Sequence, residues 1–274
     1  MGSADFSLKN KVAIITGVGK GIGKAIAIGF ARAGASVVVA SRTKADIENT
    51  ASKIRKIGSK ALVVPTDVTK ISQIENLLTR TLDSFKKVDI LVNNAGGDSG
   101  GTGYVLDLSI SDWKSGIELN LNSLFYCCKI IGGEMVISKS GNIINMTSGM
   151  GFGPYPGAAH HAAARAGVIN LTKTLALEWA PFNIRVNAMA PGYTETTLPA
   201  KAWKEHPEDK KALLKLIPLG RTAQPEEMVN TAVFLASSAS GYITGETINI
   251  SGGLITTVSP RWIEYCREMR GKKQ

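Results

Sequence analysis

The chain has 274 residues, of which 44% are hydrophobic and 20% are charged. This balance can fill a core, which excludes a disordered, collagen-like or disulfide-scaffold protein. The formal net charge of +10 favours anionic partners, either nucleic acid or phosphate-bearing small molecules. Because the sequence has no nucleic-acid motif and no interleaving of aromatic with basic residues, nucleic acid is the weaker interpretation.

Short β-branched segments alternate with longer segments of helical periodicity. In chain order, strands are predicted at residues 12–16, 36–40, 61–65, 88–96, 142–148, 183–191 and 247–251. The helices predicted between them span residues 21–33, 44–57, 71–86, 111–137, 157–180 and 225–236. Uniformly apolar strands separated by helices are typical of strands buried on both faces. The pattern therefore predicts one α/β domain with a doubly wound parallel sheet.

Two regions fall outside this alternation, and no linker or repeat divides the chain. We expect residues 192–224 to form a lid and residues 256–274 a basic tail, both within one domain spanning 1–274. The three cysteines have neither metal-ligand spacing nor a disulfide framework. The sequence also lacks a signal-peptide core and any apolar segment of the ~20 residues that span a bilayer. These observations predict a cytoplasmic protein without metal or membrane contact.

The turn after the first strand is rich in glycine and leads directly into a helix. Gly17 allows a tight turn, Gly21 allows the backbone to approach a pyrophosphate, and Gly23 lets the helix pack on the strand. The N-terminus of that helix offers free N–H groups to phosphate. The arrangement predicts a Rossmann-type dinucleotide site whose contacts are Gly17, Gly19, Lys20, Gly21, Ile22 and Gly23.

The end of the second strand lacks the acidic residue that would hold the ribose 2′-OH of NAD. Ser41 and Arg42 stand there instead, and they can hydrogen-bond and charge-pair a 2′-phosphate. We therefore predict NADP as the cofactor, with NAD as the alternative. The competing interpretation of Arg42 is a solvated loop cation.

Ordered motifs over residues 8–253 resemble those of the short-chain dehydrogenase/reductase family. The segment from Thr16 to Gly23 is similar to the family's cofactor motif, and Asn120 falls where the family has a structural and proton-relay asparagine. The resemblance implies that further residues line the cofactor, namely Asp67 and Val68 at the adenine, Asn94, Ala95 and Gly96 beside the central sheet, and Pro191, Gly192, Thr194 and Thr196 near the nicotinamide.

The active-site motif departs from the family pattern. Ser148 fits the family's catalytic serine, whereas its tyrosine and lysine positions fall on His161 and Arg165. Residues four apart on a helix share one face, so the geometry is retained while the acid/base chemistry changes. A nearby arginine should keep His161 neutral, and His161 is the candidate proton donor. Alternatives are that Tyr155 substitutes for it or that histidine merely fills the vacated space.

The segment at residues 157–179 resembles the enoyl-CoA reductase branch of this family. It implies NADP(H)-dependent hydride transfer to or from an acyl-CoA thioester, in enoyl-CoA reduction or hydroxyacyl-CoA oxidation. Ser148 would bind the substrate carbonyl, Arg165 the nicotinamide ribose, and Asn120 would keep its helix open for a water relay. The alternative is a degenerate subunit of a heteromeric dehydrogenase, such as a benzylsuccinate-pathway hydroxyacyl-CoA dehydrogenase. The family also implies a homotetramer, or a heterotetramer with a related subunit.

Overall fold

A seven-stranded parallel sheet forms the centre of the structure. The computed structural model describes residues 5–97, 103–196 and 207–254. The strands lie in the order β3-β2-β1-β4-β5-β6-β7, and every neighbouring pair is parallel. This topology confirms the doubly wound sheet predicted from the sequence. The strands are β1 (Val12–Thr16), β2 (Ser36–Ser41), β3 (Ala61–Pro65), β4 (Ile90–Asn93), β5 (Gly141–Met146), β6 (Ile184–Pro191) and β7 (Thr247–Ile250).

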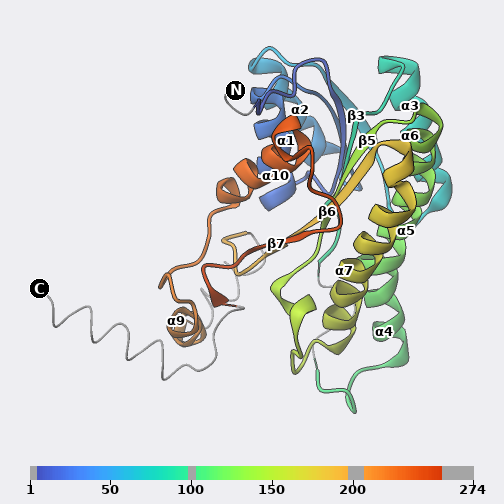
Figure 1. The fold of residues 1–274 in the computed structure, drawn as a ribbon. Coiled ribbons are helices and arrows are strands. Elements are labelled where there is room, and N and C mark those ends of the chain that lie inside the picture. The colour runs from blue at the N-terminus through green and yellow to red at the C-terminus, as the bar shows by residue number, and fades with distance from the viewer. Residues whose placement is uncertain (1–4, 98–102, 197–206, 255–274) are drawn as a thin grey trace, which may run out of the picture.

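Helices cover both faces of the sheet, as Figure 1 shows. One face carries α1 (Gly21–Arg32), α2 (Lys44–Lys56) and α10 (Val229–Ala236). The opposite face carries α3 (Ile71–Phe85), α4 (Ile110–Ile117), α5 (Ser123–Cys127), α6 (Gly133–Ser138) and α7 (Ala159–Trp179). A further helix, α9 (Pro207–Leu216), lies apart from both layers, below β7 in this view.

The core forms because each central strand carries apolar side chains on both of its faces. All five residues of β1 are buried, and Ile14 pairs in register with Val38 and Leu91. Phe30 of α1 and Leu77 of α3 are fully buried on opposite faces. Burying such a side chain stabilises the fold by about 1.5–3 kcal/mol. The two apolar layers therefore hold the carboxyl ends of the strands in fixed positions at one edge.

The strand predicted at residues 88–96 is shorter in the structure. β4 ends at Asn93, because the Asn94 N–H leaves the ladder and donates to the Val92 carbonyl and to Oγ1 of Thr16, each at 3.1 Å. The last residues of the predicted strand therefore form a loop at the carboxyl edge of the sheet.

The helix predicted at residues 111–137 runs from Ile110 to Ser138, but it is not a regular α-helix. Two π-helical turns interrupt it, Glu118–Asn122 and Cys128–Gly132. Single π-helical turns are frequent at functional sites. The first of them carries Asn120, one of the candidate residues.

The region predicted as a lid contains α9, which the sequence pattern did not reveal. Its described parts are connected to each other. A β-bridge pairs Thr194 with Ala223, and the Glu195 carboxylate accepts hydrogen bonds from Lys210 at 2.7 Å and Thr222 at 2.8 Å. Residues 197–206 of this region, and the predicted tail at 256–274, lie outside the described residues.

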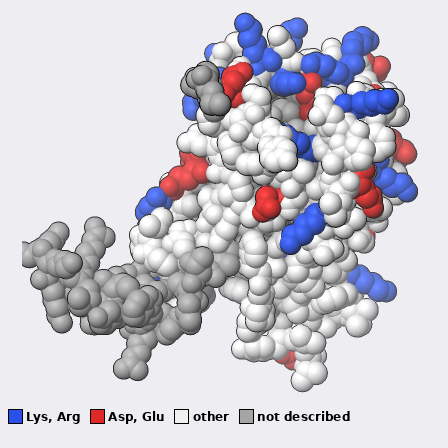
Figure 2. Space-filling view, viewed as in Figure 1, with Lys and Arg blue, Asp and Glu red and all other residues white. Residues whose placement is uncertain are grey.

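Charge is unevenly distributed over the face in Figure 2. Lys and Arg gather at the upper end of the molecule, around α2 and α3, whereas the lower part where α4 and α7 begin is mostly uncharged. Within the described ranges, no helix combines the length and apolar character that a membrane span requires.

Candidate active site

The glycine turn between β1 and α1 forms a cradle that side chains would fill. Gly17 has φ +70°, and a Cβ there would lie 2.8 Å from the Ala95 backbone. Gly21 has φ +56°, and its Cβ would lie 2.9 Å from Cγ2 of Thr196. At Gly23, a Cβ would collide with the Gly17 carbonyl and the Asn94 side chain. These positions need glycine, and they leave an open backbone surface of the kind a pyrophosphate occupies.

The N-terminus of α1 is available for phosphate. Helix α1 begins at Gly21 after an extended Lys20, and no side-chain hydrogen bond caps it. The first N–H groups of a helix have no partners inside it, and the positive end of the helix dipole lies there. Ile22 follows Gly21 in this first turn. The geometry therefore fits the cofactor that the glycine turn predicts.

The end of β2 brings together the residues predicted for the adenosine half. Ser41 is half-buried and its Oγ would lie 3.5 Å from a Cβ on Gly19, while Arg42 is exposed. Asp67 lies at the end of the neighbouring β3, where Oδ1 accepts two hydrogen bonds from Thr69, and Val68 is buried. Ser41 therefore lies against the glycine turn, and Arg42 is close enough to Asp67 to interact with its charge.

The loop after β4 is held by Thr16. Oγ1 of Thr16 accepts from the N–H groups of Asn94 at 3.1 Å and Ala95 at 3.0 Å. The Asn94 amide donates in return to the carbonyls of Thr16 and Gly17. A Cβ on Gly96 would lie 2.5 Å from the guanidinium of Arg165. Thr16 was missed as a positioning residue, although it opens the glycine motif.

The loop after β6 closes the opposite side. Pro191 ends the strand, and the Gly192 N–H continues the ladder by donating to the Ile250 carbonyl at 2.9 Å. Thr194 is buried and donates to the Gly192 carbonyl at 3.1 Å. Thr196, at the end of the described loop, contacts the Gly21 position. The structure thus brings the predicted nicotinamide-side loop against the phosphate turn.

Arg165 lies beneath the candidate catalytic centre as a buried cation. Its guanidinium donates to the Met146 carbonyl and to Oδ1 of Asn120, each at 2.9 Å, while Nε has no partner. Burial lowers the pKa of Arg165 to about 10, so it remains charged at neutral pH. Asn120 is also bonded to both backbone groups of Gly97, each at 3.0 Å. Arg165 and Asn120 therefore hold four chain segments together, namely α7, the end of β5, the π-helical turn and the loop after β4.

Ser148 and His161 lie on the two elements that Arg165 joins. Ser148 is half-buried just beyond β5, and its Oγ accepts from the Met150 N–H at 3.3 Å. Burial, with added repulsion from Arg165 and His160, lowers the pKa of His161 to about 4. The imidazole is therefore neutral at pH 7, with about one molecule in a thousand protonated. Its Nδ1 is buried without a hydrogen-bond partner.

His160 lies outside the group formed by Ser148, His161 and Arg165. It is 3% exposed, and its ring fills the space that a side chain at Gly116 would occupy. His160 therefore packs α7 onto α4, rather than lining the candidate catalytic centre beside Ser148.

A pair of tyrosines was not anticipated. The hydroxyl groups of Tyr155 and Tyr193 lie 2.5 Å apart and share a hydrogen bond. Burial and the hydrogen bond shared with Tyr155 raise the pKa of Tyr193, so its phenol keeps its proton at neutral pH. Tyr155 was considered as a substitute phenol, but its partner comes from the loop after β6 and is not detectable by sequence spacing.

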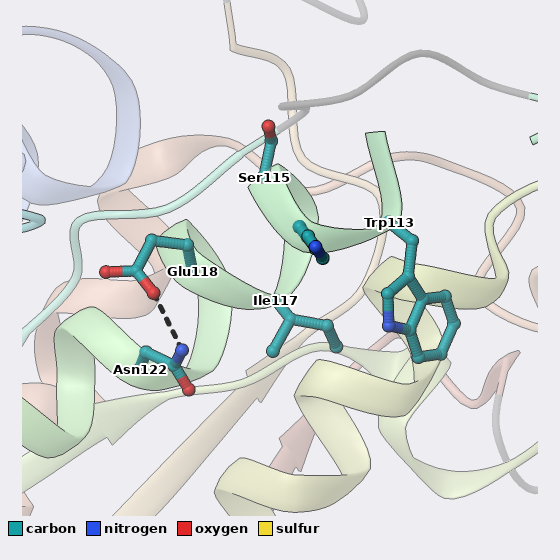
Figure 3. A pocket seen from close by; sticks show the side chains of 6 residues that line it. Trp113, Ser115, Ile117, Glu118 and Asn122 are labelled. Atoms are coloured by element: carbon teal, nitrogen blue, oxygen red, sulfur yellow. Dashed lines mark hydrogen bonds between the residues drawn. The ribbon is translucent and has the colours of Figure 1, made fainter. Parts of the chain in front are cut away.

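A separate hollow is lined by residues of α4 and of the π-helical turn that follows it, none of which is among the predicted site residues. Figure 3 shows Trp113, Ile117, Glu118 and Asn122 around it, with the Asn122 amide donating to the Glu118 carboxylate at 2.7 Å. In the parts of the chain that the structure describes, no group of three or more His, Cys, Asp or Glu could hold a metal ion.

Comparison with known proteins agrees with this geometry. The family described as "Enoyl-(Acyl carrier protein) reductase" matches residues 17–255. A 3-oxoacyl-[acyl-carrier-protein] reductase of Synechocystis sp. is 40% identical, over 91% of this chain and 98% of its own. The (2S)-[(R)-hydroxy(phenyl)methyl]succinyl-CoA dehydrogenase subunit BbsD of Thauera aromatica is 35% identical, over 90% and 97%.

Solved structures give the same result. A structure from Agrobacterium tumefaciens with bound NADP, described as a 2-deoxy-D-gluconate 3-dehydrogenase, superimposes with a TM-score of 0.85 at 35% identity, covering 93% of this chain and all of the other. The chain belongs to the short-chain dehydrogenase/reductase family of oxidoreductases. The family assignment made from the sequence is thereby confirmed.

Proposed function

We propose that the chain is an NADP(H)-dependent oxidoreductase that transfers hydride to or from an acyl-CoA thioester. The glycine cradle and the Ser41–Arg42 pair support NADP, which the A. tumefaciens relative binds. The names of the Synechocystis and Thauera relatives both specify an acyl group attached as a thioester. The nicotinamide cofactor supplies or accepts the hydride when bound.

Of the two candidate reactions, enoyl-CoA reduction and hydroxyacyl-CoA oxidation, the neutral state of His161 favours enoyl-CoA reduction. Reducing a ketone or oxidising an alcohol requires an acid or base with a pKa near the working pH, which is worth about 10²–10⁴-fold in rate. With a pKa of about 4, His161 is a weak base and is rarely protonated. Reducing a conjugated C=C bond requires a polarised thioester carbonyl, and its α-carbon can take a proton from water.

In this proposal the chain's own residues bind and polarise. Ser148 donates its hydroxyl hydrogen to the thioester carbonyl oxygen, where negative charge accumulates. Arg165 contributes a fixed positive charge beneath the site, and its bonds to Met146 and Asn120 keep α7 in register with β5. Asn120 couples this charge to the loop after β4.

The test is an assay of the purified chain with an enoyl-CoA plus NADPH and with a 3-hydroxyacyl-CoA plus NADP. We expect enoyl-CoA reduction, and a large loss in Ser148→Ala but a small one in His161→Ala. If the chain oxidises the hydroxyacyl-CoA faster than it reduces the enoyl-CoA, and His161→Ala abolishes this oxidation, the proposed reaction is contradicted. The matching acyl-carrier-protein thioester, assayed in parallel, distinguishes the carrier.

One observation favours a second candidate, a non-catalytic subunit. Both terminal nitrogens of Arg165 donate to protein acceptors, and His161 lacks the acid/base range of the residue it replaces. The Thauera relative is itself named as a subunit. If the isolated chain binds no nucleotide and turns over neither substrate, while a complex with a related chain is active, this second function holds.

We also propose a tetramer that uses the outer surface of α4, α5 and α7. Three apolar residues of α5, α7 and the π-helical turn between α5 and α6, namely Leu124, Leu175 and Cys128, are buried in the core and cannot form the interface. Phe125 is 42% exposed and Trp113, beside the hollow in Figure 3, is 40% exposed. The exposed apolar side chains of Phe125 and Trp113 therefore support an interface on this surface.

A further inference from the structure

An acidic side chain lies at the glycine turn, although the end of β2 carries none. Asp46 belongs to the first turn of α2. A Cβ built on Gly19 would lie 3.3 Å from Cβ of Asp46, 3.5 Å from its Oδ2 and 3.5 Å from Oγ of Ser41. The Asp46 carboxylate and the Ser41 hydroxyl therefore flank the same point of the turn, the side predicted to hold the adenosine ribose.

The charges around this point are mixed. Nζ of Lys20 lies 3.9 Å from Oδ2 of Asp46, and the Asp46 side chain is 34% exposed. Within the described residues, this is the one ion pair that the carboxylate makes within 4.0 Å, and Lys24 interacts with it at longer range. Most of its lone pairs thus remain available to an incoming hydroxyl donor. Arg42, exposed at the end of β2, supplies a second positive charge on the same side.

The arrangement affects the two nicotinamide nucleotides in opposite ways. A carboxylate accepts a hydrogen bond from a ribose 2′-OH, which is how an acidic residue favours NAD. The same carboxylate repels a 2′-phosphate, which carries about two negative charges near neutral pH. Ser41, Arg42 and Lys20 act in the other direction, because they donate to and charge-pair that phosphate.

We propose that Asp46 sets the preference between the two nucleotides, accepting the 2′-OH of NAD(H) from α2 and weakening the binding of the 2′-phosphate of NADP(H). This inference rests on the nucleotide-binding function proposed above. It implies that the chain uses both nucleotides, with a smaller preference for NADPH than Ser41 and Arg42 would give alone.

The isosteric change Asp46→Asn tests this role. We expect NADPH and the fragment 2′-phospho-ADP-ribose to bind about five- to twentyfold more tightly, because a unit charge a few ångströms from the phosphate is removed. NADH and ADP-ribose should bind about two- to fivefold more weakly, since the acceptor of the 2′-OH loses its charge. The gain for NADPH should shrink as salt increases.

The matched control is Glu48→Gln, which removes a carboxylate two positions along the same helix. Glu48 lies 3.7 Å from Arg55, on a different side of α2 from Asp46. Dissociation constants for the two nucleotides and the two fragments would be measured by fluorescence titration and calorimetry. Because the expected effects have opposite signs, a misfolded variant cannot reproduce them.

An unchanged ratio of the NADPH and NADH constants in Asp46→Asn, or an equal change in Glu48→Gln, overturns the role of Asp46 while leaving the proposed function intact. A wild-type chain that binds neither nucleotide overturns the proposed function and this inference together.

Discussion

Replacing Arg165 by methionine should raise the pKa of His161. Burial accounts for the largest part of the fall from 6.5 to about 4, and the charge of Arg165 is the next cause. Cβ atoms four residues apart on a helix lie about 5–6 Å apart. A unit charge at about 6 Å, with an effective dielectric constant of about 40, contributes about 1.4 kcal/mol, or about one pKa unit. The expected pKa of His161 in Arg165→Met is therefore about 5.

The measurement is an NMR titration of the imidazole signals, with His161→Gln to assign them. Arg165→Lys is the matched control, because it keeps the positive charge while removing the forked bonds to Met146 and Asn120. We expect His161 to stay near 4 in the lysine variant. An unchanged pKa in Arg165→Met, or an equal rise in both variants, would refute the view that the Arg165 charge holds His161 neutral.

The titration of His161, the glycine turn and the exposed Phe125 each allow a further test. First, the unfolded chain binds a proton at His161 more readily than the folded chain does. The free energy of unfolding should therefore be highest above pH 6.5 and fall by about 3 kcal/mol as the pH drops to about 4. Urea unfolding of His161→Gln should not show this fall, and an equal fall in both proteins would argue against the prediction. Second, Gly21→Ala places a Cβ at φ +56° and 2.9 Å from Thr196, so NADPH should bind at least about tenfold more weakly, whereas Gly133→Ala meets nothing within 4 Å and should leave binding unchanged. Third, if the chain forms the proposed tetramer, light scattering should show that Phe125→Glu dissociates it at micromolar concentration. An assembly that stays intact in this variant would place the interface elsewhere.

The sheet could be predicted from the sequence because its signals are local. Each strand is an apolar run bounded by a turn, and predicted ranges such as 12–16 and 61–65 coincide with β1 and β3. The glycine turn was equally visible, since the φ angles of Gly17 and Gly21 require glycine whatever packs against them. Local conformational requirements of this kind can be recognised from the sequence alone.

The missed features depend on contacts between distant segments. Asp46 reaches the turn at Gly19 only because α2 packs against it, and Tyr155 finds Tyr193 across 38 positions of the chain. Helix α9 lies in a segment that is too polar to show a clear helical periodicity. The ribose contact predicted for Arg165 stays a prediction, but the bonds from its Nη groups to the Met146 carbonyl and the Asn120 amide oxygen were not visible in the sequence.

The π-helical turn at Glu118–Asn122 makes the length of its helix a constraint independent of composition. A π-helical turn holds one residue more than an α-helical turn, so deleting any one of its five residues would restore regular winding. The α-helical residues on either side would keep nearly their present alignment, because four α-helical residues and five π-helical residues both turn through about 400°. The change would be confined to the turn itself, where Asn120 would lose its alignment with Gly97 and Arg165, which it now joins. The extra residue therefore serves the position of Asn120 and not the direction of the helix as a whole.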